Sequence, residues 1–261
     1  MIRISYCTIA FQKNKWGKDR LVEKPIEEIW PIVADAGYDG IEIWYPHVEM
    51  LDGGALGELA GQLEKAGLEV AMLSPYFDFT SSEESVTASI QRGGEAIAAA
   101  RTLGARGIRC FTGKVGSADA DEAQWHRAIC ALQTLADQAP DLLWALETHP
   151  HNLMDTLQAS LNLIRRVDRP NVVFIFQPST FADEPIEALK QLAPWTRHVH
   201  ATNLRDKQRT LLAEGEMDWP AIVQGLRDRG VEGYISVEWM GDEPAEVART
   251  EATYLRSLLA K

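Results

Sequence analysis

The stretch LLWALETHP, residues 142–150, decides the fold, because an apolar run of β-forming residues ends there on the polar side chain of Glu147. Side chains alternate along a strand, so Glu147 shares its face with Ala145. Three later runs repeat this pattern, each ending on one polar residue: VVFIFQPST (172–180) on Gln177, HVHATN (198–203) on His200 and YISVEW (234–239) on Glu238. The repetition predicts several strands with polar groups at their C-terminal ends.

The rest of the chain continues this alternation of strand and helix. The runs that read as strands are 2–11, 38–46, 68–77, 105–113, 142–150, 172–180, 197–203 and 231–240, and the segments with helical spacing are 24–36, 54–66, 83–103, 121–138, 155–167, 185–192, 218–229 and 244–259. Residues 203–217 read as a loop. Parallel strands joined by helical crossovers close into a barrel at eight repeats. The sequence therefore predicts an α/β fold, a (β/α)8 TIM barrel forming a single domain over residues 1–261.

Composition and charge narrow the classes of function. The 261 residues are 46% hydrophobic and 25% charged, which is typical of a globular protein. The net charge of −12 argues against a nucleic-acid or anionic-membrane surface. Three cysteines without metal or redox spacing suggest reduced thiols in a cytoplasm, and we see no signal peptide or spanning run. We therefore expect a cytoplasmic protein without membrane or nucleic-acid partners, and its oligomeric state, including a homo-oligomer, stays open.

The four strand-end residues Glu147, Gln177, His200 and Glu238 form the main candidate site. In a (β/α)8 barrel the C-terminal ends of all strands lie at one face, where catalytic residues gather. Two carboxylates, an imidazole and a carboxamide converging there can bind one divalent ion, Mn, Mg, Co or Zn. The alternatives are carboxylates that cap the following helices and a core histidine bonded to the backbone. Because a buried carboxylate is costly without a partner, two in one cavity favour a cation.

Further residues near the strand ends are candidates for binding substrate. Glu42, at the end of the second predicted strand, is expected either to bind substrate hydroxyls or to pair with a neighbouring strand, and His198 to lie a layer below His200. The remaining candidates are His149, Lys114, Arg205 and Trp16, each of which has a solvent-facing or wall-forming alternative. His149 would orient a ligand or shuttle protons, and Lys114 would stabilise an enolate. Arg205 would contact substrate oxygens, and Trp16 would stack on a sugar face.

Several stretches resemble a known superfamily, the xylose isomerase-like (β/α)8 barrels, also called the sugar phosphate isomerase/epimerase family. They are AGYDGIEIW (36–44), LETHPHNLMDT (146–156), HVHATNLRD (198–206) and AEGEMDWPAIVQGLRDRGVEGYISVEW (213–239). The resemblance implies a metal held by Glu147, Gln177, His200 and Glu238. Gln177 stands where the family usually has Asp, so the ligands carry one negative charge less. Epimerases of the family often have a substrate-contacting His a few residues after that Asp, and Thr180 stands there in this chain.

The resemblance implies a divalent-metal-dependent isomerase or epimerase that acts on a sugar or keto-sugar through an enediolate. One of Glu147 and Glu238 would remove the proton next to the carbonyl, and the other would return it. A metal-dependent lyase or dehydratase on a keto-sugar, keto-inositol or keto-glycoside is the alternative. A non-catalytic sugar-binding relative is a third hypothesis. The endonuclease branch is disfavoured, because the third and fourth predicted strands do not end on its additional His and Asp ligands.

Overall fold

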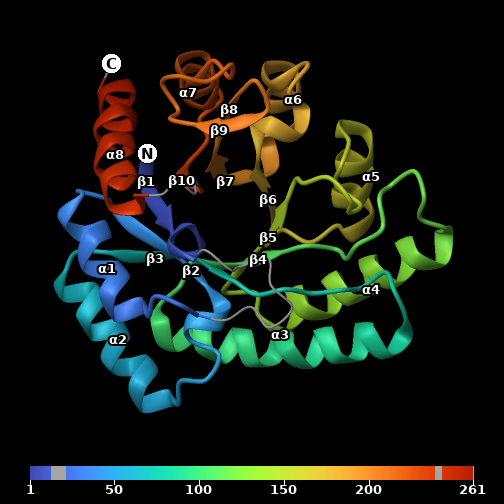
Figure 1. Ribbon diagram of the computed structural model, residues 1–261. Helices are drawn as coiled ribbons and strands as arrows, with labels where there is room; N and C mark the ends of the chain where they lie inside the picture. The colour runs from blue at the N-terminus through green and yellow to red at the C-terminus, as the bar shows by residue number, and fades with distance from the viewer. Residues whose placement is uncertain (13–21, 239–242, 261) are drawn as a thin grey trace.

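The computed structural model describes residues 1–12, 22–238 and 243–260, and within these ranges eight parallel strands close into a barrel (Figure 1). The strands are β1 (Ile2–Cys7), β2 (Gly40–Trp44), β3 (Glu69–Ser74), β4 (Gly107–Cys110), β5 (Leu143–Glu147), β6 (Val172–Phe176), β7 (Thr196–Ala201) and β10 (Gly233–Val237). Their order around the barrel is β1-β10-β7-β6-β5-β4-β3-β2, with β1 closing against β2. The predicted fold class is confirmed.

Helices surround the strands on the outside (Figure 1). They are α1 (Ile26–Asp35), α2 (Gly53–Lys65), α3 (Glu83–Leu103), α4 (Glu122–Gln138), α5 (Leu157–Val167), α6 (Pro185–Leu192), α7 (Trp219–Asp228) and α8 (Pro244–Leu259). Local chemistry sets several of these boundaries. Asp121 and Gln124 form a reciprocal capping box at the start of α4, and Gly104 ends α3 in the left-handed conformation at φ 64°. No helix of the described residues is long and apolar enough to cross a membrane.

Two segments differ from the sequence-based expectation. The segment 203–217 carries a two-stranded antiparallel hairpin, β8 (Asn203–Arg205) with β9 (Gln208–Thr210), and is not only a loop. The left-handed residues Asp206 and Lys207 make the turn that brings its strands together. The first strand ends at Cys7, and Thr8–Phe11 forms a 3-10 helix. The sequence expectation missed the hairpin because its strands are short and largely polar, so they lack an apolar run.

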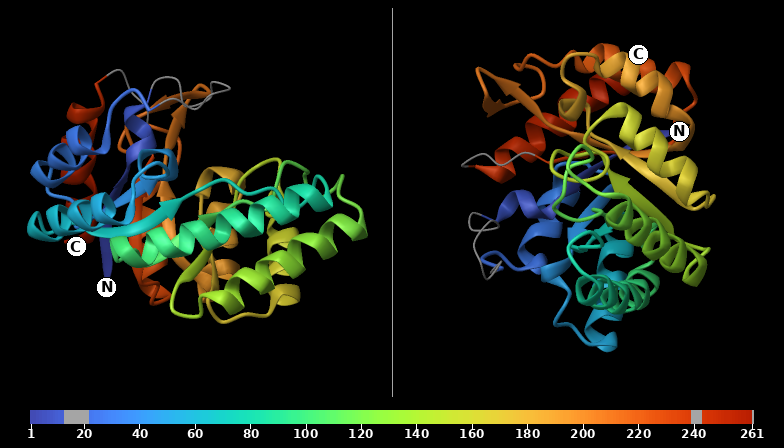
Figure 2. Two further views of the ribbon diagram at one scale, coloured as in Figure 1. Left: turned by 90° about the horizontal axis from the view of Figure 1, so that it is seen from below. Right: turned by 90° about the vertical axis from the view of Figure 1, so that its right-hand side faces the viewer.

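The two ends of the barrel differ in what they carry. Figure 2 shows the β8–β9 hairpin at one end and both chain termini toward the other. Between the ends the barrel interior holds a small apolar cluster of Met72, Ala145, Val173 and Ile175. Ala145 and Ile175 each precede a strand-end polar residue by two positions, so the alternation of the strands turns Glu147 and Gln177 inward. The C-terminal end of the barrel therefore collects the polar groups.

Glu251 on α8 is buried outside the barrel and gives the fold a predicted pH dependence. Its Oε1 accepts a hydrogen bond of 2.8 Å from the Leu212 backbone N–H, and burial raises the pKa of Glu251 to about 7. The folded state then binds more protons than the unfolded chain between about pH 4.5 and 7. We expect the free energy of unfolding to fall with rising pH across this window, by on the order of 3 kcal/mol, and to stay lower above it.

The variant Glu251→Gln isolates this effect, because glutamine keeps an acceptor for Leu212 and does not ionise. Urea unfolding at pH 5 and pH 8 should show a smaller difference in the variant than in the unsubstituted protein. Glu246→Gln, in the first turn of the same helix, is the control and should leave the difference unchanged. Parallel pH profiles for Glu251→Gln and the unsubstituted protein would contradict the prediction.

Candidate active site

Three predicted metal ligands meet at the C-terminal end of the barrel. Glu147 ends β5, His200 lies in β7 and Glu238 directly follows β10. Nδ1 of His200 lies 3.4 Å from Glu147 Oε1 and 3.8 Å from Glu238 Oε2. One ligand atom from each residue lies within 4.8 Å of the other two. Glu147 and His200 are buried, whereas 21% of the Glu238 side chain is exposed, so the group opens on the Glu238 side.

Gln177 lines the same cavity as these three residues, just after β6. Its backbone N–H donates to Thr148 Oγ1, but its side-chain Oε1 is buried without a hydrogen-bond partner in the described parts of the chain. Nδ1 of His200 is likewise buried and without a hydrogen bond there. Buried polar atoms without partners are costly, and a cation would satisfy both. Two carboxylates, an imidazole nitrogen and a carboxamide oxygen fit a divalent ion.

Glu42 lies behind His200 and determines how its ring is oriented. The Glu42 Oε2 lies 3.0 Å from His198 Nε2 and 3.1 Å from His200 Nε2, and Ser74 Oγ donates to Oε1 at 2.7 Å. Burial opposes the ionisation of Glu42, but the two imidazoles hold the pKa of this carboxyl well below its usual range. Burial opposes the protonation of His200, but Glu42, Glu147 and Glu238 raise its pKa well above the usual range. A cation at Nδ1 would instead hold the ring neutral, with Nε2 donating to Glu42.

These contacts bear on the two expectations for Glu42, binding of substrate hydroxyls or pairing with a neighbouring strand. Both carboxylate oxygens are already paired with protein groups, and the residue is 1% exposed. The alternative expectation, pairing with a neighbouring strand, is the one that the geometry favours, through Ser74 on β3 and the two histidines of β7. His198 lies beneath His200, as the alternation of β7 predicted.

Replacing Glu42 with glutamine should weaken metal binding. Glutamine is neutral and has only one acceptor oxygen, so it cannot accept hydrogen bonds from both imidazoles and from Ser74. His200 then loses the partner that fixes its tautomer. Loss of such a partner typically costs ten- to a hundredfold in metal affinity. Competition with a metal-binding dye would measure the change, with Glu49→Gln, a surface glutamate paired to Arg92, as control. Equal metal affinity for Glu42→Gln and the control would contradict the orienting role.

Arg109 on β4 is a site residue that the sequence reasoning missed. Its Nη1 lies 3.5 Å from Glu147 Oε2 and its Nη2 donates to the Ser74 carbonyl at 3.2 Å. The guanidinium stacks on the rings of Tyr76 and Phe111, 4.7 and 4.3 Å from their centroids. The sequence did contain a signal for Arg109, because an arginine within the buried run GIRC must point either into the helix layer or into the barrel.

The two catalytic candidates sit in different surroundings. Burial opposes the ionisation of Glu147, but His200 and Arg109 hold its pKa below the usual range. Burial raises the pKa of Glu238, and the neighbouring Glu147 carboxylate raises it further, although His200 acts in the opposite direction. Oε1 of Glu147 faces His200 and its Oε2 faces Arg109. Glu147 is therefore the more firmly ionised carboxylate, and Glu238 is the one more readily protonated.

A cavity of about 250 Å³ opens above this group and receives most of the other candidates. His149, His151 and Lys114 line it, as do the aromatic residues Trp44, Tyr76 and Phe111. Arg205 is not among the residues that line the cavity, whereas Arg209 of the same hairpin is, and a substrate contact of Arg205 stays a prediction. Arg209 pairs with Leu204 across the hairpin, whereas Arg205 pairs with Gln208, so the two arginines point to opposite faces. Trp16 lies outside the described residues.

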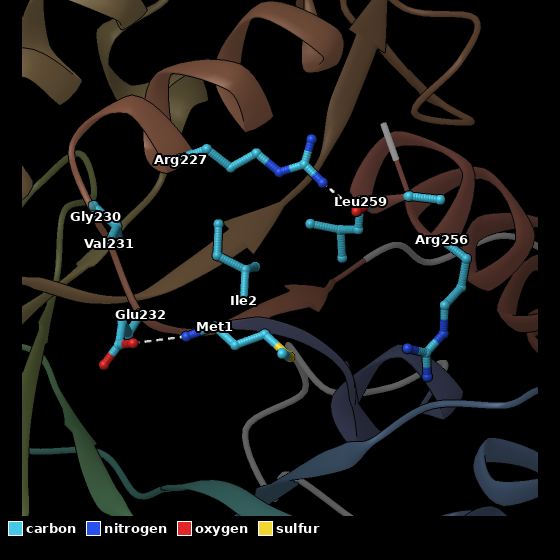
Figure 3. Close-up of a pocket in the computed structure, with 9 residues that line it drawn as sticks. Met1, Ile2, Arg227, Gly230, Val231, Glu232, Arg256 and Leu259 are labelled. Atoms are coloured by element: carbon cyan, nitrogen blue, oxygen red, sulfur yellow. Dashed lines mark hydrogen bonds and ion pairs between the residues drawn. The ribbon is translucent and has the colours of Figure 1, made fainter.

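A second cavity, of about 540 Å³, lies at the opposite end of the barrel (Figure 3). Its charged groups are already paired. The Met1 ammonium contacts Glu232 at 2.7 Å, Arg227 donates to the Leu259 carbonyl, and Arg256 bonds Asp39. In (β/α)8 barrels the catalytic residues come from the C-terminal ends of the strands. The cavity around His200 is therefore the candidate active site.

Comparison with known proteins shows which family the chain belongs to. The chain is 26% identical to the 3-dehydroshikimate dehydratase of Bacillus anthracis, over 97% of this chain and 96% of that protein. It is 24% identical to the fructoselysine 3-epimerase of Shigella flexneri, over 90% and 94%. The structure of an L-ribulose 3-epimerase matches with a TM-score of 0.82 at 22% identity, over 100% and 95%. The family described as xylose isomerase-like TIM barrel matches residues 30–258. The chain belongs to this family of xylose isomerase-like TIM barrels.

Proposed function

We propose that this protein is a metal-dependent lyase that removes the proton next to a carbonyl and expels a hydroxyl from the adjacent carbon as water. The observation that carries the proposal is the asymmetry of the two glutamates. A carboxylate that acts both as a metal ligand and as a base needs a free oxygen. Glu147 has one oxygen toward His200 and the other toward Arg109, whereas the exposed part of Glu238 faces the cavity. One base is sufficient for elimination.

Each group of the site has a place in this reaction. Glu147, Gln177, His200 and Glu238 would hold the divalent ion. When bound, such an ion polarises a carbonyl oxygen and so makes the neighbouring C–H more acidic. Glu238 takes that proton. The electron pair of the broken C–H bond forms the new double bond as the C–O bond on the next carbon breaks. The departing hydroxide receives a proton and leaves as water.

His149 is suited to supply that second proton. Its ring Nδ1 lies 2.7 Å from the Pro150 carbonyl, which can only accept, so Nδ1 carries the hydrogen in this contact. Nε2 is then the nitrogen that exchanges a proton with a ligand in the cavity. An edge contact with Phe111, at 5.3 Å between ring centroids, fixes the plane of the ring. His149, the proposed acid, follows β5, and Glu238, the proposed base, follows β10, so the two lie at different strand ends of one cavity.

Epimerisation is the second candidate function, and a separate observation favours it. Glu147 and Glu238 reach the His200 Nδ1 from β5 and β10, strands separated in the barrel by β6 and β7. Two carboxylates that flank one point could remove a proton on one side of a carbon and return it on the other. Similarity to the fructoselysine 3-epimerase supports this candidate, as similarity to the dehydratase supports the first.

The mass of the product formed in deuterated water distinguishes dehydration from epimerisation. The protein, loaded in turn with Mn²⁺, Mg²⁺, Co²⁺ and Zn²⁺, is incubated with 3-dehydroshikimate and with a set of ketoses. A lyase gives a product lighter by one water. An epimerase gives a product of unchanged mass apart from deuterium at one carbon. Absence of both outcomes with every metal and substrate would count against the proposed chemistry, and activity that survives complete removal of metal would count against the metal's role.

A further inference from the structure

A groove adjoins the candidate active site at the same end of the barrel. Its volume is about 520 Å³, against about 250 Å³ for the cavity around His200. Tyr76 and Lys114, which follow the neighbouring strands β3 and β4, line both the groove and the cavity. We call this hollow the side groove, and its other walls come from the segment 45–49 after β2, the segment 76–78 after β3 and one face of α3.

The face of α3 toward the side groove carries small side chains. Ser85, Ala88 and Ser89 lie three or four positions apart along the helix, so they share one side of it. The Asp78 backbone N–H donates to Ser89 Oγ at 2.9 Å, and that hydroxyl donates to the Asp78 carbonyl at 3.3 Å. These two bonds fix the segment after β3 against the helix, and the small side chains leave the space between them open.

Tyr45 presents a polar group to the side groove. The residue is 5% exposed, and its hydroxyl makes no hydrogen bond with the residues that the structure describes. Burial raises the pKa of Tyr45, and the carboxylates of Glu49 and Glu95 raise it further, so the hydroxyl keeps its proton. A protonated phenol can donate one hydrogen bond and accept another. The Tyr45 hydroxyl is therefore available to a hydroxyl group of a ligand.

The charges along the side groove balance. Among the described residues that line it, Glu49 and Asp78 are acidic, and Arg92 and Lys114 are basic. Arg92 on α3 forms an ion pair with Glu49, and the Asp78 carboxylate accepts hydrogen bonds from the turn that follows it. A wall with equal charges of both signs gives an ionic ligand no net attraction. Its polar groups and its tyrosine rings suit a neutral, hydroxylated ligand.

Tyr76 forms the partition between the side groove and the cavity. Trp44 Nε1 donates to its hydroxyl at 3.1 Å, and the Arg109 guanidinium lies 4.7 Å from the centroid of its ring. Trp44 and Arg109 both line the cavity, so contacts on that side hold the ring in place. The cavity is smaller than the roughly 300–1,000 Å³ of pockets for drug-sized ligands. A larger ligand would therefore place one unit in the cavity and another beyond Tyr76.

We propose that the substrate has two units, and that the side groove binds the second, a neutral hydroxylated ring of the glycosyl type. The proposal rests on the proposed function, because the first unit is the hydroxy-ketone that reacts beside His200. The second unit takes no part in proton transfer. Binding of a part that does not react helps to position the part that does.

Matched ligands test this proposal without turnover. Calorimetry on the Mg²⁺-loaded protein compares fructose with turanose, maltulose and isomaltulose, which carry a glucosyl unit on different oxygens of fructose. We expect at least one of these disaccharides to bind about tenfold or more tightly than fructose. The disaccharide that does so identifies the oxygen through which the second unit leaves the cavity. If none binds more tightly than fructose, the proposal is overturned.

Three variants locate the second unit. Ala88 is exposed and lines the side groove but not the cavity, so Ala88→Phe should fill the groove and leave the fold intact. It should reduce the affinity for the disaccharide to that for fructose, while the affinities for fructose and Mg²⁺ stay unchanged. Tyr45→Phe removes one hydroxyl and should reduce the preference partly. Thr87→Phe, at an exposed neighbouring position of α3 that does not line the groove, is the matched control and should keep the full preference. A full preference in Ala88→Phe would overturn the assignment to the groove.

Failure of this proposal and failure of the proposed function remain distinguishable. If only the second unit is wrong, 3-dehydroshikimate or a simple ketose should still exchange deuterium or lose water, and the preference for a disaccharide should be absent. If only the proposed chemistry is wrong, that preference and its loss in Ala88→Phe should persist, and no ligand should exchange deuterium or lose water.

Discussion

Replacing Glu238 with glutamine should lower the rate of substrate deprotonation by a factor of about 10²–10⁴, the usual contribution of a general acid or base. Glutamine keeps the shape of the side chain and one oxygen for a metal but cannot accept a proton. Because part of Glu238 faces the cavity and neither of its oxygens lies within 3.5 Å of His200 Nδ1, the variant should stay folded and bind metal. Deuterium uptake from solvent, followed by mass spectrometry, measures the effect.

The matched control for Glu238→Gln is Glu232→Gln. Glu232 lies just before β10, at the opposite end of the barrel, where its carboxylate pairs with the Met1 ammonium. The Glu232→Gln variant should leave deuterium uptake unchanged. Uptake at the unsubstituted rate in Glu238→Gln, with metal bound, would remove Glu238 from proton transfer. If Glu147→Gln then stopped uptake without loss of metal, the base would be Glu147 instead.

Replacing Arg109 with leucine should destabilise the protein by about 3–5 kcal/mol, because it removes from the buried carboxylate of Glu147 one of its two cationic partners, His200 being the other. The Arg109 side chain is 5% exposed and that of Glu147 is 3% exposed, so water cannot take the place of the guanidinium. The Ser74 carbonyl and the faces of Tyr76 and Phe111 lose their contacts as well. Urea unfolding of metal-free protein measures the loss.

The double variant Arg109→Leu with Glu147→Gln tests the cause. If the penalty comes from an unpaired buried charge, the second substitution should restore part of the stability that the first removes. Arg169→Leu, which breaks an exposed pair with Asp137, is the control and should cost no more than about 1 kcal/mol. Additive losses in the double variant, or a loss for Arg109→Leu no larger than that of the control, would contradict the prediction.

The strand-end residues could be placed from the sequence because the pattern that places them is local. In LLWALETHP and its three counterparts, alternation along the strand assigns each residue to a face, and the apolar run fixes where the strand ends. The eightfold repeat then orders these ends around a barrel. The sequence by itself therefore determined the fold and the common face of Glu147, Gln177, His200 and Glu238. Their role as metal ligands stays a prediction.

Only the tertiary structure decided which partners these residues have. Glu42 and His198 are 156 positions apart in the chain, and Arg109 and Glu147 are 38 apart, so no local pattern links them. Their contacts depend on which strands become neighbours or face each other when the barrel closes. The choice of Arg209 over Arg205 depends likewise on the register of a short polar hairpin, and a shift of one residue would exchange the two. The left-handed turn at Asp206 and Lys207 sets this register, and the polar sequence of the hairpin has no apolar alternation that would reveal it.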